Sequence, residues 1–387
     1  MVGSFEVTAQ DPTSAARCGR LVTAHGVVET PAFMPVGTRA TVKTLSSEDL
    51  EELGATMILG NTYHLYLRPG AERIDRLGGL HRFMSWSRGI LTDSGGFQVM
   101  SLSSLRRVDE DGVTFRSHLD GSTHRLTPER AIQTQELLGS DVAMVLDECL
   151  PYPGPPPEEV EASLRRTERW AERALRAHRR HDQLLFGIVQ GGMEPDLRRQ
   201  AARHLAQMDF AGYGIGGLSV GEPKELMYQL LDVITPELPP DRPRYLMGVG
   251  SPDAIAEAVA RGVDLFDSVL PTRIARHGTV FTRQGPITIK NARYAEDDQP
   301  IDPQCDCKVC RRYSRAYLRH LFNAGESLGP RLGTYHNLYV LLRLMERIRA
   351  AIRQGTFAQV RQEAAALFPP RQGSPGSDPA PTTEVNR

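Results

Sequence analysis

The sequence lacks any long apolar segment. No stretch of its 387 residues approaches the ~20 consecutive apolar residues that a membrane-spanning helix needs, and the N-terminus does not resemble a signal peptide. These absences argue against a membrane protein or a secreted one, so we expect a cytoplasmic protein without a membrane partner. The length is sufficient for a large buried core, in one large domain or in a barrel with a small appended domain.

Cysteine is also scarce, and its distribution is uneven. Three of the five cysteines, Cys305, Cys307 and Cys310, are clustered, which is typical of a metal site and not of a disulfide framework. With His336 they offer three thiolates and an imidazole, the closed tetrahedral set of a structural zinc site. His320 is the alternative fourth ligand, but we expect His336 to lie just before a helix, from where it can reach the site. Unrelated buried cysteines are the simpler alternative.

Net charge is nearly absent, at −1, but the charges are divided unequally along the chain. Residues 1–270 carry 28 Lys and Arg against 37 Asp and Glu, whereas residues 271–347 carry 13 against 7. A basic C-terminal part indicates an anionic partner that binds one region of the molecule. A solvated charged surface is the alternative interpretation.

Short apolar segments separated by helical patterns organise the first 270 residues. The segments are residues 31–37, 55–60, 89–93, 141–147, 184–190, 212–217, 244–248 and 263–267. Helical patterns are clearest near residues 195–208, 223–235 and 252–261. This alternation predicts a (β/α)8 barrel, that is, a TIM barrel of the α/β class, with a doubly wound open sheet as the alternative.

The chain changes character after the last of these segments. We expect the barrel to occupy residues 1–277, with an insertion of hairpins over residues 98–126. Residues 278–367 are predicted to form a zinc-binding subdomain with closing helices, one of them from about residue 337 to residue 353. Residues 368–387 have the low-complexity composition of a disordered tail.

Polar residues, and in one case a glycine, end several of the predicted strands. They are Asp93, Asp147, Gln190, Gly217 and Asp267. In a barrel these ends meet on one face, where active sites are built, so we expect the side chains to converge there. A strand-end aspartate that caps the next turn is the alternative for each one taken alone.

The residue types at this face suit one kind of chemistry. Two or three carboxylates around a pocket can break a glycosidic bond, one as nucleophile or stabiliser and another as acid or base. A further aspartate and a glutamine suit the edge of a purine, because carboxylates accept from N–H donors and amides both donate and accept.

Motifs along most of the chain resemble those of the tRNA-guanine transglycosylases. They are DSGGFQVMSL at 93–102, LDEC at 146–149, IVQGG at 188–192, GIGGLSVGE at 214–222, MGVGSP at 247–252, DLFDSVLPTR at 264–273, CDCKVC at 305–310 and YHN at 335–337. The resemblance covers residues 3–367. It implies an irregular TIM barrel with a zinc-binding subdomain, and an enzyme that exchanges guanine in tRNA for a 7-deazaguanine base.

The resemblance also implies residue roles. Asp267 corresponds to the nucleophile that attacks ribose C1′, and Asp93 to the acid/base that handles protons on the two bases. The base is implied to lie between Phe97 and Met247; many members have Tyr where Phe97 stands, so a hydroxyl contact is missing here. The other implied base contacts are Asp93, Ser94, Gly95, Gly96, Asp147, Gln190, Gly217 and Leu218. The implied anticodon-loop contacts are Gly248, Val249, Gly250, Ser251, Pro252, Asp253, Ala254, Thr272, Arg273, Ile274, Ala275 and Arg276.

Two residues place the chain in a branch of the family. Val220 and Cys149 resemble the bacterial pattern, which implies insertion of 7-aminomethyl-7-deazaguanine (preQ1) at the first anticodon position of GUN tRNAs. A homodimer with one structural Zn2+ per chain is implied by the family as well. The alternatives are a eukaryotic-like enzyme that inserts queuine, which has a smaller residue in place of Val220, and a non-catalytic tRNA-binding partner subunit. The presence of Asp267 and Asp93 argues against the partner subunit, and the lack of a His-x-His pair in the early strands argues against a metal-dependent barrel hydrolase.

Overall fold

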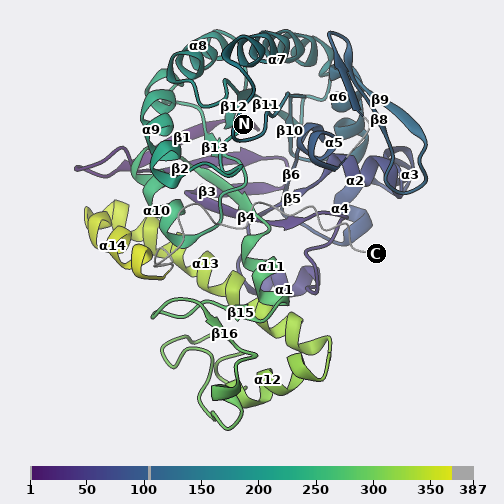
Figure 1. Ribbon diagram of the computed structural model, residues 1–387. Coiled ribbons are helices and arrows are strands. Elements are labelled where there is room, and N and C mark those ends of the chain that lie inside the picture. Colours follow the sequence, from purple (N-terminus) through teal and green to yellow (C-terminus); the bar gives the residue numbers. More distant parts are fainter. Residues whose placement is uncertain (1, 103–105, 368–387) are drawn as a thin grey trace.

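Eight parallel strands form a closed barrel, in which they follow one another in the order of the chain (Figure 1). The computed structural model describes residues 2–102 and 106–367. The barrel strands are β4 (Ala32–Gly37), β5 (Met57–Gly60), β6 (Gly89–Thr92), β10 (Val142–Met144), β11 (Leu184–Val189), β12 (Gly212–Ile215), β13 (Arg244–Leu246) and β14 (Leu265–Ser268). Because β14 pairs with β4, the predicted (β/α)8 barrel is confirmed and the open sheet is wrong.

Amphipathic helices cover the barrel. The main ones are α6 (Pro128–Leu138), α7 (Pro157–Ala177), α8 (Pro195–Ala206), α9 (Lys224–Ile234, followed by the 3-10 turn η1, Thr235–Glu237) and α10 (Pro252–Ala260). In α7 the buried residues Val160, Leu164, Trp170 and Ala174 recur at helical spacing, so one face packs inward and the Arg/Glu face is solvated. Seven of the eight barrel strands are buried along their whole length, and β14 is buried except at Asp267, which explains why apolar residues predominate in these strands.

Short elements fill the connections between the early strands. They are α1 (Ser47–Glu52), α2 (Thr62–Leu67), α3 (Ala71–Arg76), α4 (Gly79–Met84) and α5 (Gly96–Leu102). The predicted hairpins exist as the antiparallel sheet β7 (Arg106–Asp109), β8 (Gly112–Arg116) and β9 (Thr123–Leu126). The prediction is wrong for residues 98–102, which belong to α5. Val99 and Met100 are buried there in a cluster with Phe115 and Trp170, and the helical turn lets both enter it.

A three-stranded antiparallel sheet precedes the barrel and was not predicted. It consists of β1 (Phe5–Gln10), β2 (Arg17–Thr23) and β3 (Gly26–Thr30). The Arg17 guanidinium contacts the Asp264 carboxylate at 2.6 Å, directly before β14. His25, in the β2–β3 turn, contacts Asp141 directly before β10. The sheet therefore covers the N-terminal ends of the barrel strands, opposite the predicted site.

The C-terminal part begins with α11 (Leu270–Arg276) and lies below the barrel in Figure 1. It contains β15 (Thr279–Val280), β16 (Ile287–Thr288), the 3-10 turn η2 (Ala292–Tyr294), α12 (Arg315–Asn323), α13 (Leu328–Gln354) and α14 (Phe357–Leu367). The predicted helix start at residue 337 is wrong, because α13 begins at Leu328. The start is hard to predict because Gly333 resembles a helix breaker in the sequence. A Cβ at this position would lie 3.3 Å from the Ala275 carbonyl oxygen, so close packing onto α11 favours glycine inside the helix. The predicted tail, residues 368–387, lies outside the described residues.

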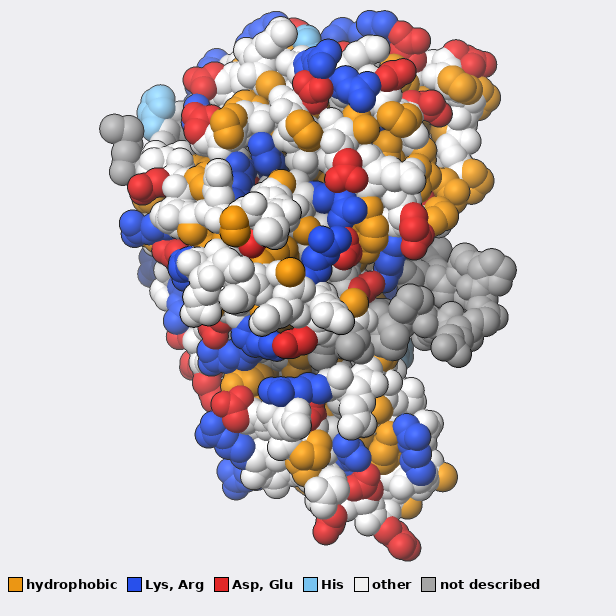
Figure 2. Space-filling model, turned by 90° about the vertical axis from the view of Figure 1, so that its left-hand side faces the viewer, with side chains coloured by type: hydrophobic (Ala, Val, Ile, Leu, Met, Phe, Trp, Pro, Cys, Tyr) orange, Lys and Arg blue, Asp and Glu red, His pale blue; other side chains and the backbone are white. Residues whose placement is uncertain are grey.

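Charges of both signs are distributed over the surface. On the face drawn in Figure 2, Lys and Arg side chains are interspersed with Asp and Glu. Within residues 2–102 and 106–367, no helix combines the length and apolar character required to cross a membrane.

Candidate functional site

Strand-end residues of β6, β10 and β11 are linked by hydrogen bonds at the C-terminal face of the barrel. Asp147, which follows β10, accepts hydrogen bonds from Ser94 Oγ at 3.2 Å and from Gln190 Nε2 at 2.7 Å. A Cβ on Gly217 would lie 2.4 Å from Gln190 Oε1, so the loop after β12 packs directly on that amide. The predicted convergence of residues from different strands is therefore present in the structure.

Asp93 lies directly after β6 and is held by three donors. Its Oδ2 accepts from Asn61 Nδ2 at 2.5 Å and Gln98 Nε2 at 2.9 Å, and its Oδ1 accepts from the Thr62 N–H at 2.8 Å. Burial raises the pKa of Asp93 to about 6 against these donors, and the Asp267 carboxylate adds to the rise. A carboxyl group with this pKa exchanges protons readily near neutral pH.

Asp147 has a similarly raised pKa. Burial raises the pKa of Asp147 to about 6, although hydrogen bonds from Gln190 and Ser94 to the carboxylate lower it. Gly96 lies against this residue: a Cβ there would be 2.7 Å from the Asp147 carbonyl oxygen. Glycine at 96 therefore permits the close approach of the DSGG turn, and Gly95 has the positive φ of 84° that the turn requires.

Asp267 is the third carboxylate and lies within β14. Its Oδ1 accepts from the Tyr245 hydroxyl at 2.6 Å and from the Gly248 N–H at 2.8 Å. Burial raises the pKa of Asp267 against these two bonds. Burial and the nearby Asp267 carboxylate raise the pKa of Tyr245 well above its ordinary value, so its hydroxyl remains a donor. No described residue donates to Asp267 Oδ2.

Four residues that hold these carboxylates were not among the predicted site residues. Asn61 and Thr62 follow β5, so the rule that polar residues end the strands could have found them. Gln98 stands inside the DSGGFQ motif, but its sequence position gives no sign that it reaches back to Asp93. Tyr245 lies within an apolar strand, and no sequence signal separates it from a core residue.

The loop after β12 is fixed by Glu222. Its two carboxylate oxygens accept from the Ser219 N–H at 2.5 Å and the Val220 N–H at 2.9 Å. Since the N–H and C=O of a trans peptide point in opposite directions, the Leu218 carbonyl points away from Glu222. Ser219 has a positive φ of 59°, an uncommon conformation for serine.

The residues implied for stacking and RNA contact differ in accessibility. Phe97 is 39% exposed, and Met247 is half-buried. The residues implied to contact the anticodon loop form two segments, 248–254 and 272–276, which we call the RNA segments. Their buried members are Val249, Gly250, Ser251, Pro252, Ala254, Thr272 and Ala275. The accessible members are Gly248, Asp253, Arg273, Ile274 and Arg276.

The predicted metal ligands come together in the C-terminal part. Cys305, Cys307 and Cys310 place their sulfurs 3.9, 3.5 and 3.4 Å from His336 Nδ1. A tetrahedral zinc ion with ordinary Zn–S and Zn–N lengths requires about 3.6 Å between S and N ligands, so the cluster can hold this ion. His336 lies inside α13 and not before it, which corrects the prediction. Its Nε2 lies 2.7 Å from the Phe281 carbonyl oxygen, so Nε2 carries the proton and Nδ1 is free to bind metal.

A second group of potential ligands lies at the opposite end of the barrel. His25, His81 and Asp141 place ligand atoms within 4.8 Å of one another. The two imidazole rings are stacked, with centroids 3.5 Å apart and planes at 14°. Lone pairs in nearly parallel ring planes cannot converge on one ion. In addition, Asp141 already accepts from two backbone N–H groups, of His25 and Ile90. We therefore interpret this group as a contact between the N-terminal sheet and the barrel.

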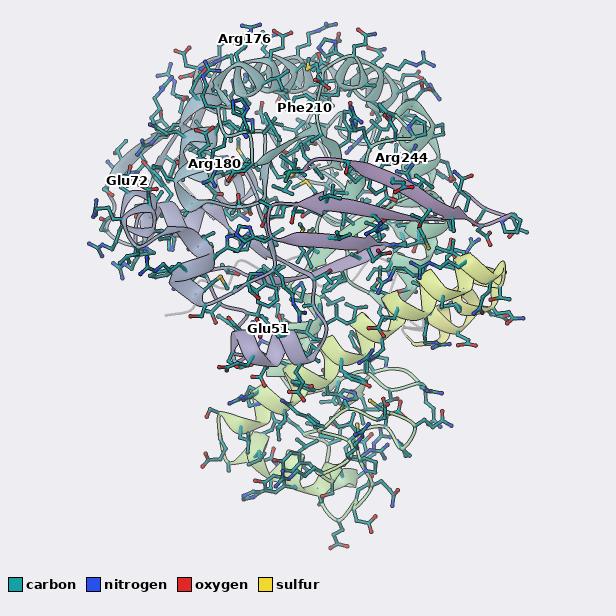
Figure 3. The ribbon with its side chains drawn as sticks, turned by 180° about the vertical axis from the view of Figure 1, so that it is seen from behind. Glu51, Glu72, Arg176, Arg180, Phe210 and Arg244 are labelled. Carbon is teal, nitrogen blue, oxygen red and sulfur yellow. The ribbon has the colours of Figure 1, made fainter. Side chains whose placement is uncertain are left out.

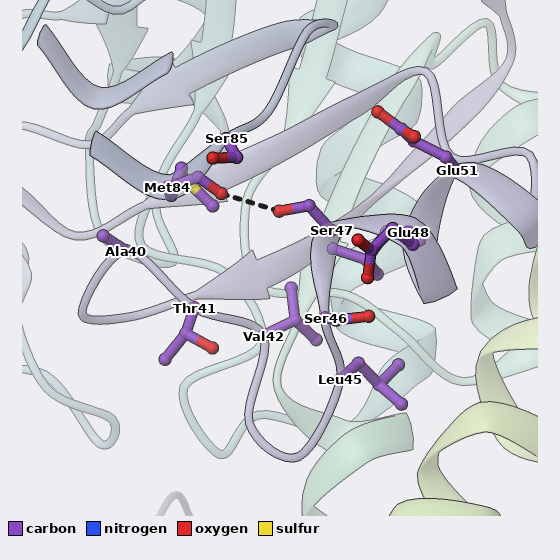
Figure 4. A pocket seen from close by; sticks show the side chains of 11 residues that line it. Ala40, Thr41, Val42, Leu45, Ser46, Ser47, Glu48, Glu51, Met84 and Ser85 are labelled. Atoms are coloured by element: carbon purple, nitrogen blue, oxygen red, sulfur yellow. Dashed lines mark hydrogen bonds between the residues drawn. The ribbon is translucent and has the colours of Figure 1, made fainter. Parts of the chain in front are cut away.

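An open pocket of about 340 Å³ lies apart from the carboxylates (Figure 4). The Ser47 hydroxyl donates to the Met84 carbonyl at 2.8 Å across it. The lining residues are Ala40, Thr41, Val42, Leu45, Ser46, Ser47, Glu48, Leu50, Glu51, Met84 and Ser85. None of the predicted site residues lines it.

Barrel and site together define the class of protein. The chain is a TIM-barrel protein of the α/β class with three carboxylates at its strand ends, and a Cys3His cluster is appended to the barrel. A model of the family described as queuine tRNA-ribosyltransferase matches residues 11–370. The chain is 60% identical over 371 residues to the queuine tRNA-ribosyltransferase of Moorella thermoacetica, covering 96% of this chain and 98% of the relative. It is 60% identical over 363 residues to that of Pelotomaculum thermopropionicum (94% and 98%) and 58% identical over 360 residues to that of Geobacillus kaustophilus (93% and 94%).

The chain belongs to the queuine tRNA-ribosyltransferase family. The family resemblance seen in the sequence motifs is thus confirmed, and so is the expectation of a transferase.

Proposed function

We propose that this enzyme replaces guanine by preQ1 at the wobble position of tRNAs with a GUN anticodon, those for Asp, Asn, His and Tyr, in queuosine biosynthesis. The observation that carries the proposal is the set of three strand-end carboxylates, each with different partners. Family membership supports tRNA as the substrate. The reaction is a double displacement through a covalent enzyme–tRNA intermediate.

Asp267 is the proposed nucleophile. Its Oδ1 is occupied by Tyr245 and Gly248, so Oδ2 is the oxygen that attacks ribose C1′. The bond from C1′ to guanine N9 breaks, its electron pair goes to the base, and the new C1′–O bond links tRNA to the enzyme. In the second displacement N9 of preQ1 attacks C1′, and the Asp267 carboxylate leaves.

Asp93 is the proposed acid and base. It gives a proton to the departing guanine and takes one from the entering preQ1, so that no proton is gained or lost over the cycle. Its pKa of about 6 keeps both forms accessible near neutral pH, which suits a group that must act in both directions. Asn61, Thr62 and Gln98 hold the carboxylate between these steps.

Base recognition is proposed for the set around Asp147. This carboxylate can accept from N1–H and the 2-amino group of guanine, while Gln190 and the backbone at Gly217 and Leu218 face the O6 side. Phe97 and Met247 would enclose the ring, with Ser94, Gly95 and Gly96 forming the adjacent turn.

Selection of preQ1 is proposed for the loop after β12. Since Glu222 holds the Ser219 N–H, the Leu218 carbonyl is oriented as an acceptor for the aminomethyl ammonium. The half-buried Val220 leaves room for this group but excludes the cyclopentenediol of queuine. Val220→Gly should therefore incorporate queuine while retaining preQ1. Efficient queuine incorporation by the wild type would contradict the bacterial-type assignment and leave the transglycosylase assignment standing.

The remaining proposals concern metal, RNA and assembly. Cys305, Cys307, Cys310 and His336 hold one Zn2+ per chain, which cross-links residues 305–310 to α13 within the subdomain of residues 278–367, outside the barrel of residues 1–277, and takes no part in the reaction. Among the residues of the two RNA segments, the accessible Arg273 and Arg276 contact the anticodon loop. A cytoplasmic homodimer is proposed from the family.

The test is an exchange assay with purified protein and tRNA preloaded with labelled guanine. Release of label by preQ1, with preQ0 and queuine as competing bases, is the expected result. A partner subunit without catalysis would bind tRNA and release nothing. A hydrolase would release guanine without any added base.

A further inference from the structure

Arg198 is buried completely, at the start of α8, and has no acidic partner. Its exposed fraction is 0%, and no described carboxylate forms an ion pair with its guanidinium. Burial lowers its pKa only to about 10, while Cys149 and Glu222 raise it, so the group remains a cation. An unpaired buried charge is costly, and replacement of buried charges by apolar side chains of similar volume is often neutral or stabilising. A reason other than stability is therefore expected.

The guanidinium binds backbone carbonyls of two neighbouring strands and their loops. Nη1 donates to Val189 O at 3.2 Å and Gly216 O at 2.6 Å, Nε to Gly192 O at 2.8 Å, and Nη2 to Gly217 O at 3.2 Å. Val189 is the last residue of β11, and Gly216 follows β12. Four bonds from one planar group thus fix the spacing between these two strand ends.

The carbonyl groups that Arg198 binds lie next to Gln190 and Gly217, the residues proposed to contact the base edge. Gln190 follows Val189 directly, and a Cβ on Gly217 would lie 2.4 Å from Gln190 Oε1 and 3.1 Å from Arg198 Nη2. Arg198, Gln190 and Gly217 therefore form one packed unit in which a shift of the guanidinium moves both of the others.

We propose that Arg198 is a positioning residue for base recognition: it fixes the carbonyls at the ends of β11 and β12 and thereby holds Gln190 and Gly217 against the base edge. This inference rests on the proposed assignment of Gln190 and Gly217 as base contacts. Arg198 itself does not touch the base.

The test uses Arg198→Met, which keeps the aliphatic stem and removes the donors. In guanine exchange, the KM for guanine should rise about 10- to 100-fold, because displaced partners leave polar groups of the bound base without hydrogen bonds. The KM for tRNA should stay within about twofold, since the tRNA contacts lie on other elements. A residue that only stabilised the fold would lower Tm without separating the two KM values.

Arg244→Met is the matched control. Arg244 is also buried and donates to backbone carbonyls, Gly262 O and Leu238 O, but it lies beside the N-terminal sheet (Figure 3). This variant should lower Tm and leave both KM values unchanged. Arg198→Lys is the second variant: one nitrogen cannot span both strands, so the KM for guanine should rise there as well.

A guanine KM within about twofold of wild type in either folded Arg198 variant overturns the inference. Insolubility of both variants also overturns it, in favour of a structural role. Absence of exchange in the wild type would instead contradict the proposed function, so the two failures are distinguishable.

Discussion

Asp93→Asn should stabilise the folded protein at alkaline pH while it abolishes base exchange. Burial raises the pKa of Asp93 from 3.8 to about 6, so the folded state binds this proton more tightly than the unfolded chain does. The protonated group is therefore favourable to folding below the unfolded pKa, and this contribution is lost as the pH rises through the folded pKa. At pH 8 the wild type must keep a buried carboxylate ionised, and the amide removes that requirement.

The magnitude follows from the pKa difference. A shift of about two units at ~1.36 kcal/mol per unit gives about 3 kcal/mol at pH 8 and about half of this at pH 5. The stability advantage of the variant should thus grow by about 1.5 kcal/mol between these pH values. The new amide oxygen still accepts from the Thr62 N–H, but the new NH2 group replaces the oxygen that accepts from Asn61 and Gln98, so both of these side-chain amides must rotate to present an oxygen to it.

Thermal unfolding at pH 5 and pH 8, at fixed zinc concentration, measures this change. The Tm of the variant relative to wild type should be higher at pH 8 than at pH 5. Asp141→Asn is the control of opposite sign: although Asp141 is buried, hydrogen bonds from His81, His25 and the Ile90 N–H lower its pKa, so its carboxylate stabilises the fold at both pH values. That control should lower Tm at both. A difference between Asp93→Asn and wild type that does not depend on pH would refute the reasoning.

Other substitutions test the remaining assignments. Asp267→Asn should abolish exchange and the covalent adduct but keep tRNA binding; an adduct that survives denaturing electrophoresis would exclude Asp267 as nucleophile. Cys307→Ser should lose stoichiometric zinc in metal analysis, whereas Cys18→Ser, a buried cysteine of the N-terminal sheet, should retain it; full zinc content in the first variant would disprove the ligand set. The double variant Arg273→Ala, Arg276→Ala should bind tRNA less tightly, and its affinity should fall less steeply with rising salt concentration than that of the wild type. Unchanged affinity across a salt titration would contradict that contact.

The barrel and the core of the site could be predicted because both follow from local sequence. A parallel strand buried on both faces is a continuous apolar run, and a polar residue at its end must lie at the C-terminal face. The strand-end positions of Asp93, Asp147 and Asp267 follow from the sequence in this way. The cysteine spacing identified the metal cluster for the same reason, since three of its ligands lie close together in the chain.

What could not be predicted depends on contacts between distant segments. Gln98 reaches back to Asp93 across a helical turn, and Tyr245 reaches Asp267 from the neighbouring strand. Neither contact leaves a periodic signal. The N-terminal sheet was missed because its strands are partly exposed and polar, as suits strands that cover a barrel end. The start of α13 was missed because Gly333 and Gly329 resemble helix breakers in sequence, although tight packing requires them.

The position of His336 within α13 has a consequence for zinc removal. The next residue, Asn337, accepts from the Phe281 N–H at 2.9 Å and donates to Pro271 O at 3.0 Å and Thr279 O at 3.1 Å. One helical turn therefore carries both a ligand of the metal cluster and the side chain that holds the start of α11 and the β15 segment that follows this helix. Loss of the metal frees this turn, and the first segment to shift is α11 with its arginines. Since the base contacts lie on β6, β10, β11 and β12, the Cys307→Ser variant should raise the KM for tRNA more than that for guanine, and the reverse order would show that the cluster and α11 are not coupled.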